Sequence, residues 1–575
     1  MRASLRLLVT AAGLGLVPGL AGCRPEPQLL AASPLAEVKR PPPLPAPTAG
    51  SAEPAATPTA GAVVPASSTE VQVRLPGGAL LVLHEDHIVK TVALQAWVLA
   101  GAADEPDDRL GVAHLTERLL FHEQAQAPVR RIFHSGGEAA SWTTPDHTVF
   151  HVLVPSSGWR LGVELLGAVL GARQTALQLS ESALARQRQA ILTELRQEAA
   201  VPQRAALQAL LGLAFGVHPY RRPLLGRPET LDKLTQADVA EFFATRYTAA
   251  RLTVVVTGDF NSAALTERLA GELGNALVSL HPGPPLPERP SEPPQQAPRV
   301  AILPQDSEPG RARVLLGFHV PSARSADIVA LEVAAVLLGS GEARLSRERP
   351  QRLDGGEEPS AVSYTARDPG LFLSGMAVVP SQIEEAARLL TSEALRLGQR
   401  EVSGAELQRA QRLLLADSAY LRETPTGRAR RLGFFRSLGL APADHDRHLR
   451  ALTPLSLRQA LGRYLVPENL TLVALRPPAG AGRGDAAGSD SAAGLLRRLQ
   501  LQVGQSAAAL RPLRPAPVAA QVRATSPGMF EYALPSGARL LIVPEHSVEI
   551  VGIAALWPGG LRGEDERTAG AHQLL

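Results

Sequence analysis

Apolar residues alternate with polar ones, or recur every three to four positions, over most of residues 71–475. Residues 71–75 and 79–84 alternate around Pro76-Gly77-Gly78, which predicts a β-hairpin. After this hairpin, the alternating pattern predicts further strands at residues 91–99, 148–154 and 252–257. The helical pattern predicts helices at residues 110–122, 158–175, 180–200, 202–214, 230–247 and 262–273. Runs of strands followed by runs of helices indicate an α+β fold with a mixed sheet. Residues 71–280 are therefore expected to form one domain.

The pattern resumes after residues 281–298, which carry Pro at eight positions and are expected to be a linker. Strands are predicted at residues 299–303, 313–319, 371–378 and 470–475, and helices at residues 326–338, 382–398, 404–422, 427–438 and 454–465. Residues 299–478 are therefore expected to form a second domain.

Two other segments are expected to connect the folded parts of the chain. Residues 24–70 are rich in Pro, Ala, Ser and Thr, with hardly any large apolar side chain, so they bury too little surface to offset their ordering entropy. Residues 479–526 are rich in Ala, Gly, Arg and Pro, with one possible helix at residues 490–510. The first is expected to be a tether and the second a linker.

The overall composition and net charge bear on whether the protein binds nucleic acid. Of the 575 residues 45% are hydrophobic, and the formal net charge is only +3. A balance this close gives no reason to expect nucleic-acid binding. Lysine occurs only at positions 39, 90 and 233, so the basic residues are almost all arginine.

The N-terminus predicts export. Arg2 and Arg6 precede a short apolar run, which ends at Leu20-Ala21-Gly22-Cys23, the only cysteine of the chain. That ending resembles a bacterial lipobox, so residues 1–23 are expected to be a lipoprotein signal peptide and Cys23 to be lipidated. The run contains Pro18 and is shorter than the ~20 residues of a membrane-spanning helix. The expected location is the bacterial envelope, lipid-anchored to the membrane and facing the periplasm or the exterior; the alternative is an ordinary signal peptide with an incidental cysteine.

Candidate chemistry lies on the helix predicted at residues 110–122. It places His114, Glu117 and Arg118 on one face, because residues three and four apart lie on neighbouring turns. The inverted zinc-peptidase motif His-x-x-Glu-His uses two histidines as ligands and the glutamate as general base. This chain has the first histidine and the glutamate, but Arg118 stands at the second histidine.

Four stretches, in order, are similar to the insulinase/pitrilysin family of zinc peptidases, which includes the mitochondrial processing peptidase. They begin at Leu75-Pro-Gly-Gly, Gly136-Gly-Glu-Ala-Ala-Ser-Trp, His218-Pro-Tyr-Arg-Arg-Pro and Arg246-Tyr-Thr-Ala-Ala-Arg. The resemblance implies two homologous sheet-plus-helices domains that form a clamshell, with zinc as cofactor and polypeptide as substrate.

The resemblance also implies a third ligand, a glutamate about 76 residues beyond the second histidine position, where Glu194 stands. A supporting glutamate of the family is Gln187 here, and a supporting asparagine is Ala140. A catalytic zinc takes three protein ligands and a water, and arginine cannot be a ligand. His114 and Glu194 are thus an incomplete metal site, in which zinc is expected to be absent or weakly bound and Glu117 is a vestigial base.

Two details complete this expectation for the site. Arg118 is expected to replace the metal charge and to pair with Glu194 or Glu117. His122 lies eight residues from His114, about 12 Å along a helix, so it is not expected to complete the site.

The second domain also departs from the family pattern. An Arg and, seven residues on, a Tyr engage substrate in the family, but Arg347 is followed at that distance by Asp354, and Tyr364 is the nearest tyrosine.

The opening of the first domain recurs near the C-terminus. Tyr532-Ala-Leu-Pro-Ser-Gly-Ala-Arg-Leu-Leu-Ile repeats Val73-Arg-Leu-Pro-Gly-Gly-Ala-Leu-Leu-Val-Leu, so residues 527–575 are expected to be the truncated start of a second unit. His572 then aligns with His114, and Leu575 with Glu117. The expectation is a fragment of a protein with two such units, the second also lacking its base.

Three interpretations follow. The first is a noncatalytic pseudo-peptidase that binds extended polypeptide or an active family subunit. The alternatives are a zinc metalloendopeptidase with a modified metal site and a structural scaffold of the envelope.

Overall fold

The computed structural model describes residues 70–75, 78–171, 180–278, 288–304, 310–339, 353, 359–477 and 497–498, with strand residues 530–533 and 539–542. The predicted signal peptide with Cys23, the tether, and the region of His572 and Leu575 lie outside the described residues. Among the described helices, none is both long and apolar enough to cross a membrane.

The first domain is built on a six-stranded mixed sheet in the order β1-β2-β6-β3-β5-β4. The strands are β1 (Glu70–Arg74), β2 (Leu80–Glu85), β3 (Thr91–Val98), β4 (Glu138–Thr143), β5 (Thr148–Pro155) and β6 (Leu252–Gly258). Only the β2–β6 pair is parallel. Every residue of β6 is buried, as expected of a central strand covered on both faces.

The helices of this domain are α1 (Val112–Leu119), α2 (Gln126–His134), α3 (Trp159–Leu170), α4 (Glu181–Ala199), α5 (Pro202–Ala214), α6 (Pro228–Leu231), α7 (Gln236–Arg246) and α8 (Ser262–Val278). A π-helical turn, Leu120–Gln124, follows α1. Helix α3 packs on β3 and β5, and α8 packs on α3. The helix predicted at residues 230–247 is in fact two, because Thr235 and Asp238 form a capping box that begins α7.

The second domain has a five-stranded sheet in the order β7-β11-β8-β10-β9. Its strands are β7 (Arg299–Pro304), β8 (Ala312–Val320), β9 (Ser360–Tyr364), β10 (Gly370–Val378) and β11 (Leu470–Arg476). Its helices are α9 (Ile328–Gly339), α11 (Ile383–Gln399), α12 (Gly404–Glu423), α13 (Pro425–Ser437), α14 (Pro442–Ala451) and α15 (Pro454–Tyr464). The sequence pattern did not predict α2, α14, β4 or β9.

The two sheets share one topology. In each, the parallel pair (β2–β6 or β7–β11) is followed by three strands that pair antiparallel in the same order. The two domains therefore have the same architecture, as the family resemblance implied.

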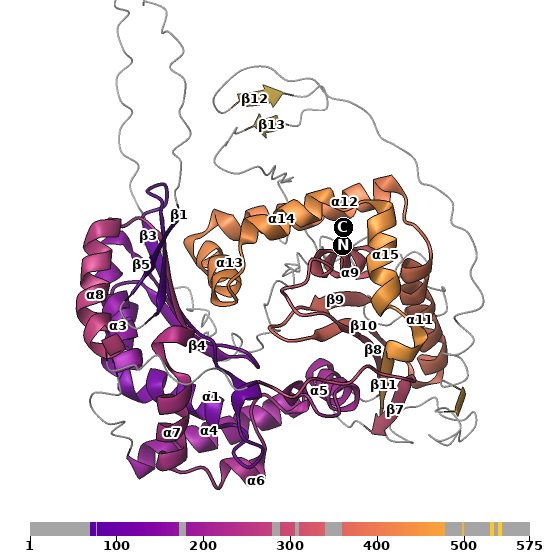
Figure 1. The fold of residues 1–575 in the computed structure, drawn as a ribbon, viewed down its shortest axis with the longest axis horizontal. Helices are drawn as coiled ribbons and strands as arrows, with labels where there is room; N and C mark the ends of the chain where they lie inside the picture. The colour runs from indigo at the N-terminus through magenta and orange to yellow at the C-terminus, as the bar shows by residue number, and fades with distance from the viewer. Residues whose placement is uncertain are drawn as a thin grey trace, which may run out of the picture.

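Each domain covers a sheet face of the other with one helix (Figure 1). Helix α13 of the second domain packs on β3 and β6, where Leu432, Phe434 and Phe435 join a core with Trp97 and Val255. Helix α5 of the first domain packs on β8 and β11, in a core that includes residues Ala206, Leu210, Leu373 and Val473. This reciprocal packing fixes the two domains to each other.

The hairpin of the C-terminal repeat has the same register as the hairpin that opens the chain. In β12 (Phe530–Ala533) and β13 (Arg539–Ile542), Ala533 pairs with Arg539, and in β1 and β2 Arg74 pairs with Leu80. These are the positions that the sequence repeat aligns. The repeated sequence thus specifies the same local structure twice.

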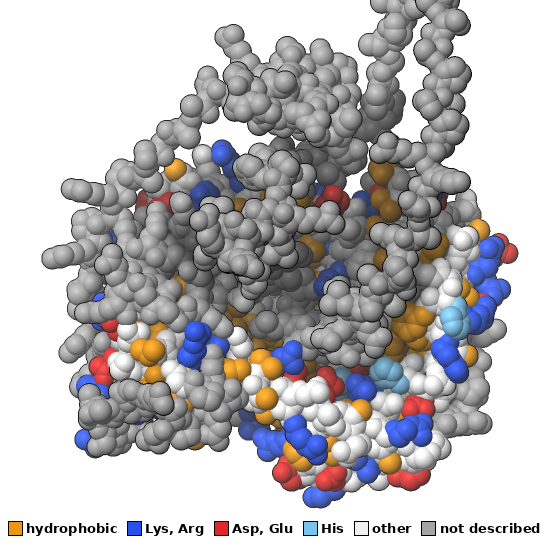
Figure 2. Space-filling view, turned by 180° about the vertical axis from the view of Figure 1, so that it is seen from behind, with side chains coloured by type: hydrophobic (Ala, Val, Ile, Leu, Met, Phe, Trp, Pro, Cys, Tyr) orange, Lys and Arg blue, Asp and Glu red, His pale blue; other side chains and the backbone are white. Residues whose placement is uncertain are grey.

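The face of the molecule in Figure 2 carries basic and acidic side chains side by side over the first domain. No large field of one sign is visible among the described side chains of that face.

Candidate functional site

Helix α1 is held at its N-terminus by a buried carboxyl group. Glu105 is 3% exposed and accepts hydrogen bonds from the backbone N–H groups of Gly111 (2.9 Å) and Ala113 (2.8 Å). Gly111 has φ +98°, a conformation that favours glycine, and a Cβ there would lie 2.7 Å from the Leu231 side chain. Glu105 and Gly111 together fix the position and direction of α1, which packs against α4, α7 and β4.

His114 lies between two carboxylates. Its Nδ1 is 3.1 Å from Glu117 Oε2 and its Nε2 is 3.2 Å from Glu194 Oε2. Burial alone would lower the pKa of His114, but the hydrogen bonds and charges of Glu117 and Glu194 outweigh it and raise the pKa to about 9. Without a metal, the ring is therefore an imidazolium at neutral pH, and it donates from both nitrogens.

Glu117 is 2% exposed and accepts hydrogen bonds from three side chains. Ser141 and Thr143, both on β4, donate to its two carboxylate oxygens, and His114 donates to Oε2. Burial would raise the pKa of Glu117, but His114, Ser141 and the nearby Arg118 charge hold it below its ordinary value. Glu117 is thus a fixed carboxylate rather than one poised to take a proton.

Arg118 links α1 to α4. Its Nη1 lies 3.5 Å from Glu194 Oε2, and its Nε donates to Gln187 Oε1 at 3.1 Å. Gln187 in turn donates from Nε2 to Glu123 at 3.0 Å. Burial would raise the pKa of Glu194, but His114 and Arg118 hold it below its ordinary value. The four ionisable groups His114, Glu117, Arg118 and Glu194 form one closed network, with Arg118 paired to one of the two carboxylates expected from the sequence.

These residues do not fit a zinc ion. Among the described residues, no group of three or more His, Cys, Asp or Glu side chains could hold a metal ion. The guanidinium of Arg118 touches the same oxygen of Glu194 that accepts from His114. A dication at this point would lie beside the permanent charge of Arg118 and would have only two protein ligands, His114 and Glu194, where a catalytic zinc takes three.

The other residues singled out from the sequence lie apart from this network. His122 sits on the π turn and packs edge-on against Phe121, with ring centroids 5.2 Å apart. Burial and the Arg118 charge lower the pKa of His122. Ala140 lies on β4 opposite His151, and it offers no polar atom beyond its backbone.

The Arg-and-Tyr pair of the family cannot be placed, because positions 347 and 354 lie outside the described residues. Tyr364 is described: burial raises its pKa, and its ring lies 6.3 Å from that of Tyr220.

Sequence reasoning missed a buried charge cluster between the domains. Arg289, in the predicted linker, pairs with Asp104 (2.9 Å), Asp146 (2.6 Å) and Asp368 (2.8 Å). Tyr220 of the His218-Pro-Tyr segment also donates to Asp146. The only sequence signal for this buried charge cluster was the position of Arg289, a charged residue inside a proline-rich run.

Two interlocked domains of one topology, with a His-x-x-Glu helix beside an edge strand, are the arrangement that the family resemblance implied. Comparison with known sequence families agrees. Residues 80–228 match "Insulinase (Peptidase family M16)" and residues 233–414 match "Peptidase M16 inactive domain". The chain belongs to the insulinase (M16) family of peptidases.

Individual relatives show the same relationship. An uncharacterized zinc protease of Mycobacterium leprae is 28% identical over 336 residues, 54% of this chain and 72% of the relative. Subunit beta of the mitochondrial-processing peptidase of Blastocladiella emersonii is 25% identical over 431 residues, 70% of this chain and 88% of that protein. A protease from Helicobacter pylori of known structure has the same fold, with a TM-score of 0.65 and 22% identity over 71% of this chain and all of that one.

Proposed function

We propose that this chain is a noncatalytic member of the insulinase family that binds extended polypeptide, or a partner subunit, at the bacterial envelope. The observation that carries the proposal is the closed network of His114, Glu117, Arg118 and Glu194. Each group that would bind a metal or activate water is instead bound to its neighbour. The carboxylate of Glu117 accepts from three side-chain donors, Ser141, Thr143 and His114, which fix its orientation.

The surface that we propose for polypeptide is the edge of strand β4, next to this network. Strand β4 is the last strand of the first sheet and pairs only with β5 among the described strands. An unpaired strand edge can add an extended peptide through backbone hydrogen bonds, without any catalytic group. Ser141 and Thr143 of the same strand tie it to Glu117. The proposed role of the network is therefore to hold β4 rigid against α1.

Two further points support the partner and the location. The relative from Blastocladiella emersonii is by its name one subunit of a processing peptidase. The sequence Leu20-Ala21-Gly22-Cys23 would anchor the chain to the envelope membrane through a lipid on Cys23. Both features suit a protein that binds extended polypeptide or a partner subunit at a membrane surface.

The decisive experiment is metal analysis of the full chain with Cys23→Ser, alone and combined with Arg118→His. We expect the protein with Arg118 intact to purify well below stoichiometric zinc. Arg118→His restores histidines at i and i+4 and removes the cation, so that variant should hold about one zinc per chain. Arg118→Gln, which removes the charge without supplying a ligand, is the control and should stay metal-free.

Stoichiometric zinc on the protein that retains Arg118, lost on Glu194→Ala, would refute the proposal and indicate an endopeptidase with a modified site. A metal-free protein that binds no extended peptide and no partner subunit would instead indicate a scaffold.

A further inference from the structure

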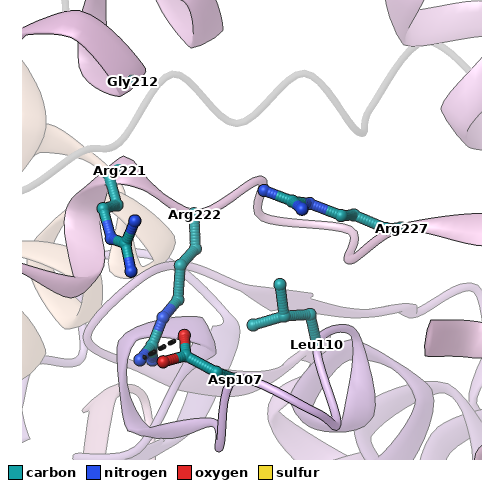
Figure 3. A pocket seen from close by; sticks show the side chains of 6 residues that line it. All are labelled: Asp107, Leu110, Gly212, Arg221, Arg222 and Arg227. Carbon is teal, nitrogen blue, oxygen red and sulfur yellow. Dashed lines mark ion pairs between the residues drawn. The ribbon is translucent and has the colours of Figure 1, made fainter. Parts of the chain in front are cut away.

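A cavity of about 340 Å³ opens beside the start of α1 and is lined by arginine. Its walls are Asp107, Leu110, Gly212, Arg221, Arg222 and Arg227 (Figure 3). They come from the loop before α1, from α5, and from the segment that joins α5 to α6. Three guanidinium groups and one carboxylate therefore share one small space.

Two of the three guanidinium groups are free to bind a ligand. Arg221 and Arg227 are exposed, and no described acidic side chain forms an ion pair with either. Arg222 is only 14% exposed in its side chain and is fixed, donating from Nη1 to the carbonyl oxygen of Glu105 at 2.6 Å. Glu105 is the residue that caps α1.

Arg222 already binds one carboxylate in this cavity. Its Nη2 lies 2.9 Å from Asp107 Oδ1, an ion pair that Figure 3 marks with a dashed line. The Asp107 side chain remains 69% exposed. The lining thus shows how a carboxylate is held here, and it leaves two arginines without one.

We infer that this cavity binds a carboxylate of the polypeptide ligand, either an acidic side chain or the free C-terminus, through Arg221 and Arg227. Guanidinium groups bind carboxylates with paired, charge-assisted hydrogen bonds, which gives geometric selectivity as well as attraction. The cavity adjoins the loop that positions α1, and α1 packs against the edge strand β4. The inference rests on the proposed function, since it names the kind of chain that is captured.

The test measures the affinity of a fluorescent extended peptide that ends in two aspartates with a free C-terminus. The matched peptide carries asparagines and a C-terminal amide. The protein is the full chain with Cys23→Ser. Two partly exposed ion pairs predict a preference of about tenfold for the acidic peptide. A third peptide, with aspartates and an amide, separates the side chains from the terminus as the source of the carboxylate.

Removing the two free cations should abolish the preference. The double variant R221Q/R227Q is expected to bind both peptides equally, with the neutral peptide's affinity unchanged. The charge-matched control is R412Q/R450Q, which removes two exposed arginines from the second domain and should keep the preference.

A second test adds a negative charge inside the cavity and keeps all three arginines. A Cβ on Gly212 would meet no atom within 4 Å. Gly212→Glu should therefore fold, place its own carboxylate near the arginines, and lower the preference, whereas Gly212→Gln should not.

The outcomes separate the two proposals. Binding of the neutral peptide without any acidic preference would overturn the cavity assignment and leave the proposed function intact. An acidic preference that survives R221Q/R227Q, or that falls equally in R412Q/R450Q, would also overturn the assignment. Failure of every peptide to bind would overturn the capture of polypeptide and its carboxylate together.

Discussion

At the scale of single residues, Arg118 changes what the helix face can do. In the family motif this position is a histidine ligand, whereas here a permanent cation pairs with Glu194 and bonds Gln187. Under the proposed function, this guanidinium takes the place of the metal as a positive partner of Glu194. Its Nε also bonds the Gln187 side chain, at the position where the family resemblance implies a supporting glutamate.

Glu105 is a second residue whose role depends on its burial. It satisfies two N–H groups at the start of α1, which have no partner within the helix. Burial raises the pKa of Glu105 to about 8, although the amides of Gly111 and Ala113 act in the opposite direction.

Removing this cap should weaken the first domain. Glu105→Ala leaves two buried amides without acceptors, so we expect the free energy of unfolding to fall by about 2 kcal/mol. Urea unfolding followed by circular dichroism measures it. Glu138→Ala, at an exposed residue of β4, is the control, and a loss equal to that of Glu105→Ala would contradict the capping role.

At the scale of elements, the reciprocal packing of α5 and α13 holds the two domains together. Both helices have 13 residues and begin with proline, and each covers the sheet of the other domain. Their fit differs, however. A Cβ on Gly433 of α13 would lie 2.0 Å from Trp97 Nε1, so this helix lies directly on the indole ring of β3.

The contrast gives a matched pair of substitutions. Gly433→Ala must displace either α13 or Trp97, so we expect a loss of about 1–3 kcal/mol in stability. Gly212→Ala in α5 meets open space and improves helix propensity, so it should be neutral or stabilising by up to about 1 kcal/mol. Thermal unfolding compares the two variants, and equal melting temperatures would refute the close approach of α13 to Trp97.

At the scale of the whole molecule, buried polar groups lie where the domains meet. His147 contacts Ser437 of α13 at 2.9 Å, and His151 is buried near Arg430 of the same helix. Burial lowers the pKa of each histidine to about 4. The charged groups that act on His147 are Asp146, Arg289, Arg367 and Asp104.

The low pKa values predict that acid loosens the docking of α13. Between about pH 6.5 and pH 4 the unfolded chain binds a proton on each histidine and the folded chain does not, so stability falls as pH falls through this window. For His147 the loss is on the order of 3 kcal/mol at pH 4. Urea unfolding at a series of pH values from 7 to 4 measures it.

Substitution of His147 separates this effect from general acid denaturation. His147→Gln should make the stability less dependent on pH in that window, whereas His134→Gln, at an exposed histidine, should not. An unchanged pH profile for His147→Gln would show that the histidine is not responsible.

The sequence by itself determined much of the fold. Alternation and helical periodicity located most strands and helices within a few residues, because each element must bury one face or stripe. The repeated Leu-Pro-x-Gly-Ala segment specified one hairpin register twice, since a short turn fixes pairing locally. The spacing of His114, Glu117 and Arg118 likewise placed three side chains on one helix face, because helical geometry is local.

Only the tertiary structure decided which distant groups meet. Glu105 and Gly111 are close in sequence, yet the role of Glu105 depends on its burial, which no local pattern shows. The contact of Arg118 with Gln187 and Glu194 depends on α4 packing against α1. The reciprocal packing of α5 and α13 and the pairing of Arg289 with three aspartates are also long-range. So are the contacts of Arg222 with Glu105 and Asp107 at the cavity. Such contacts follow from the packing of whole elements, in which side chains far apart in the chain are placed by surfaces that fit.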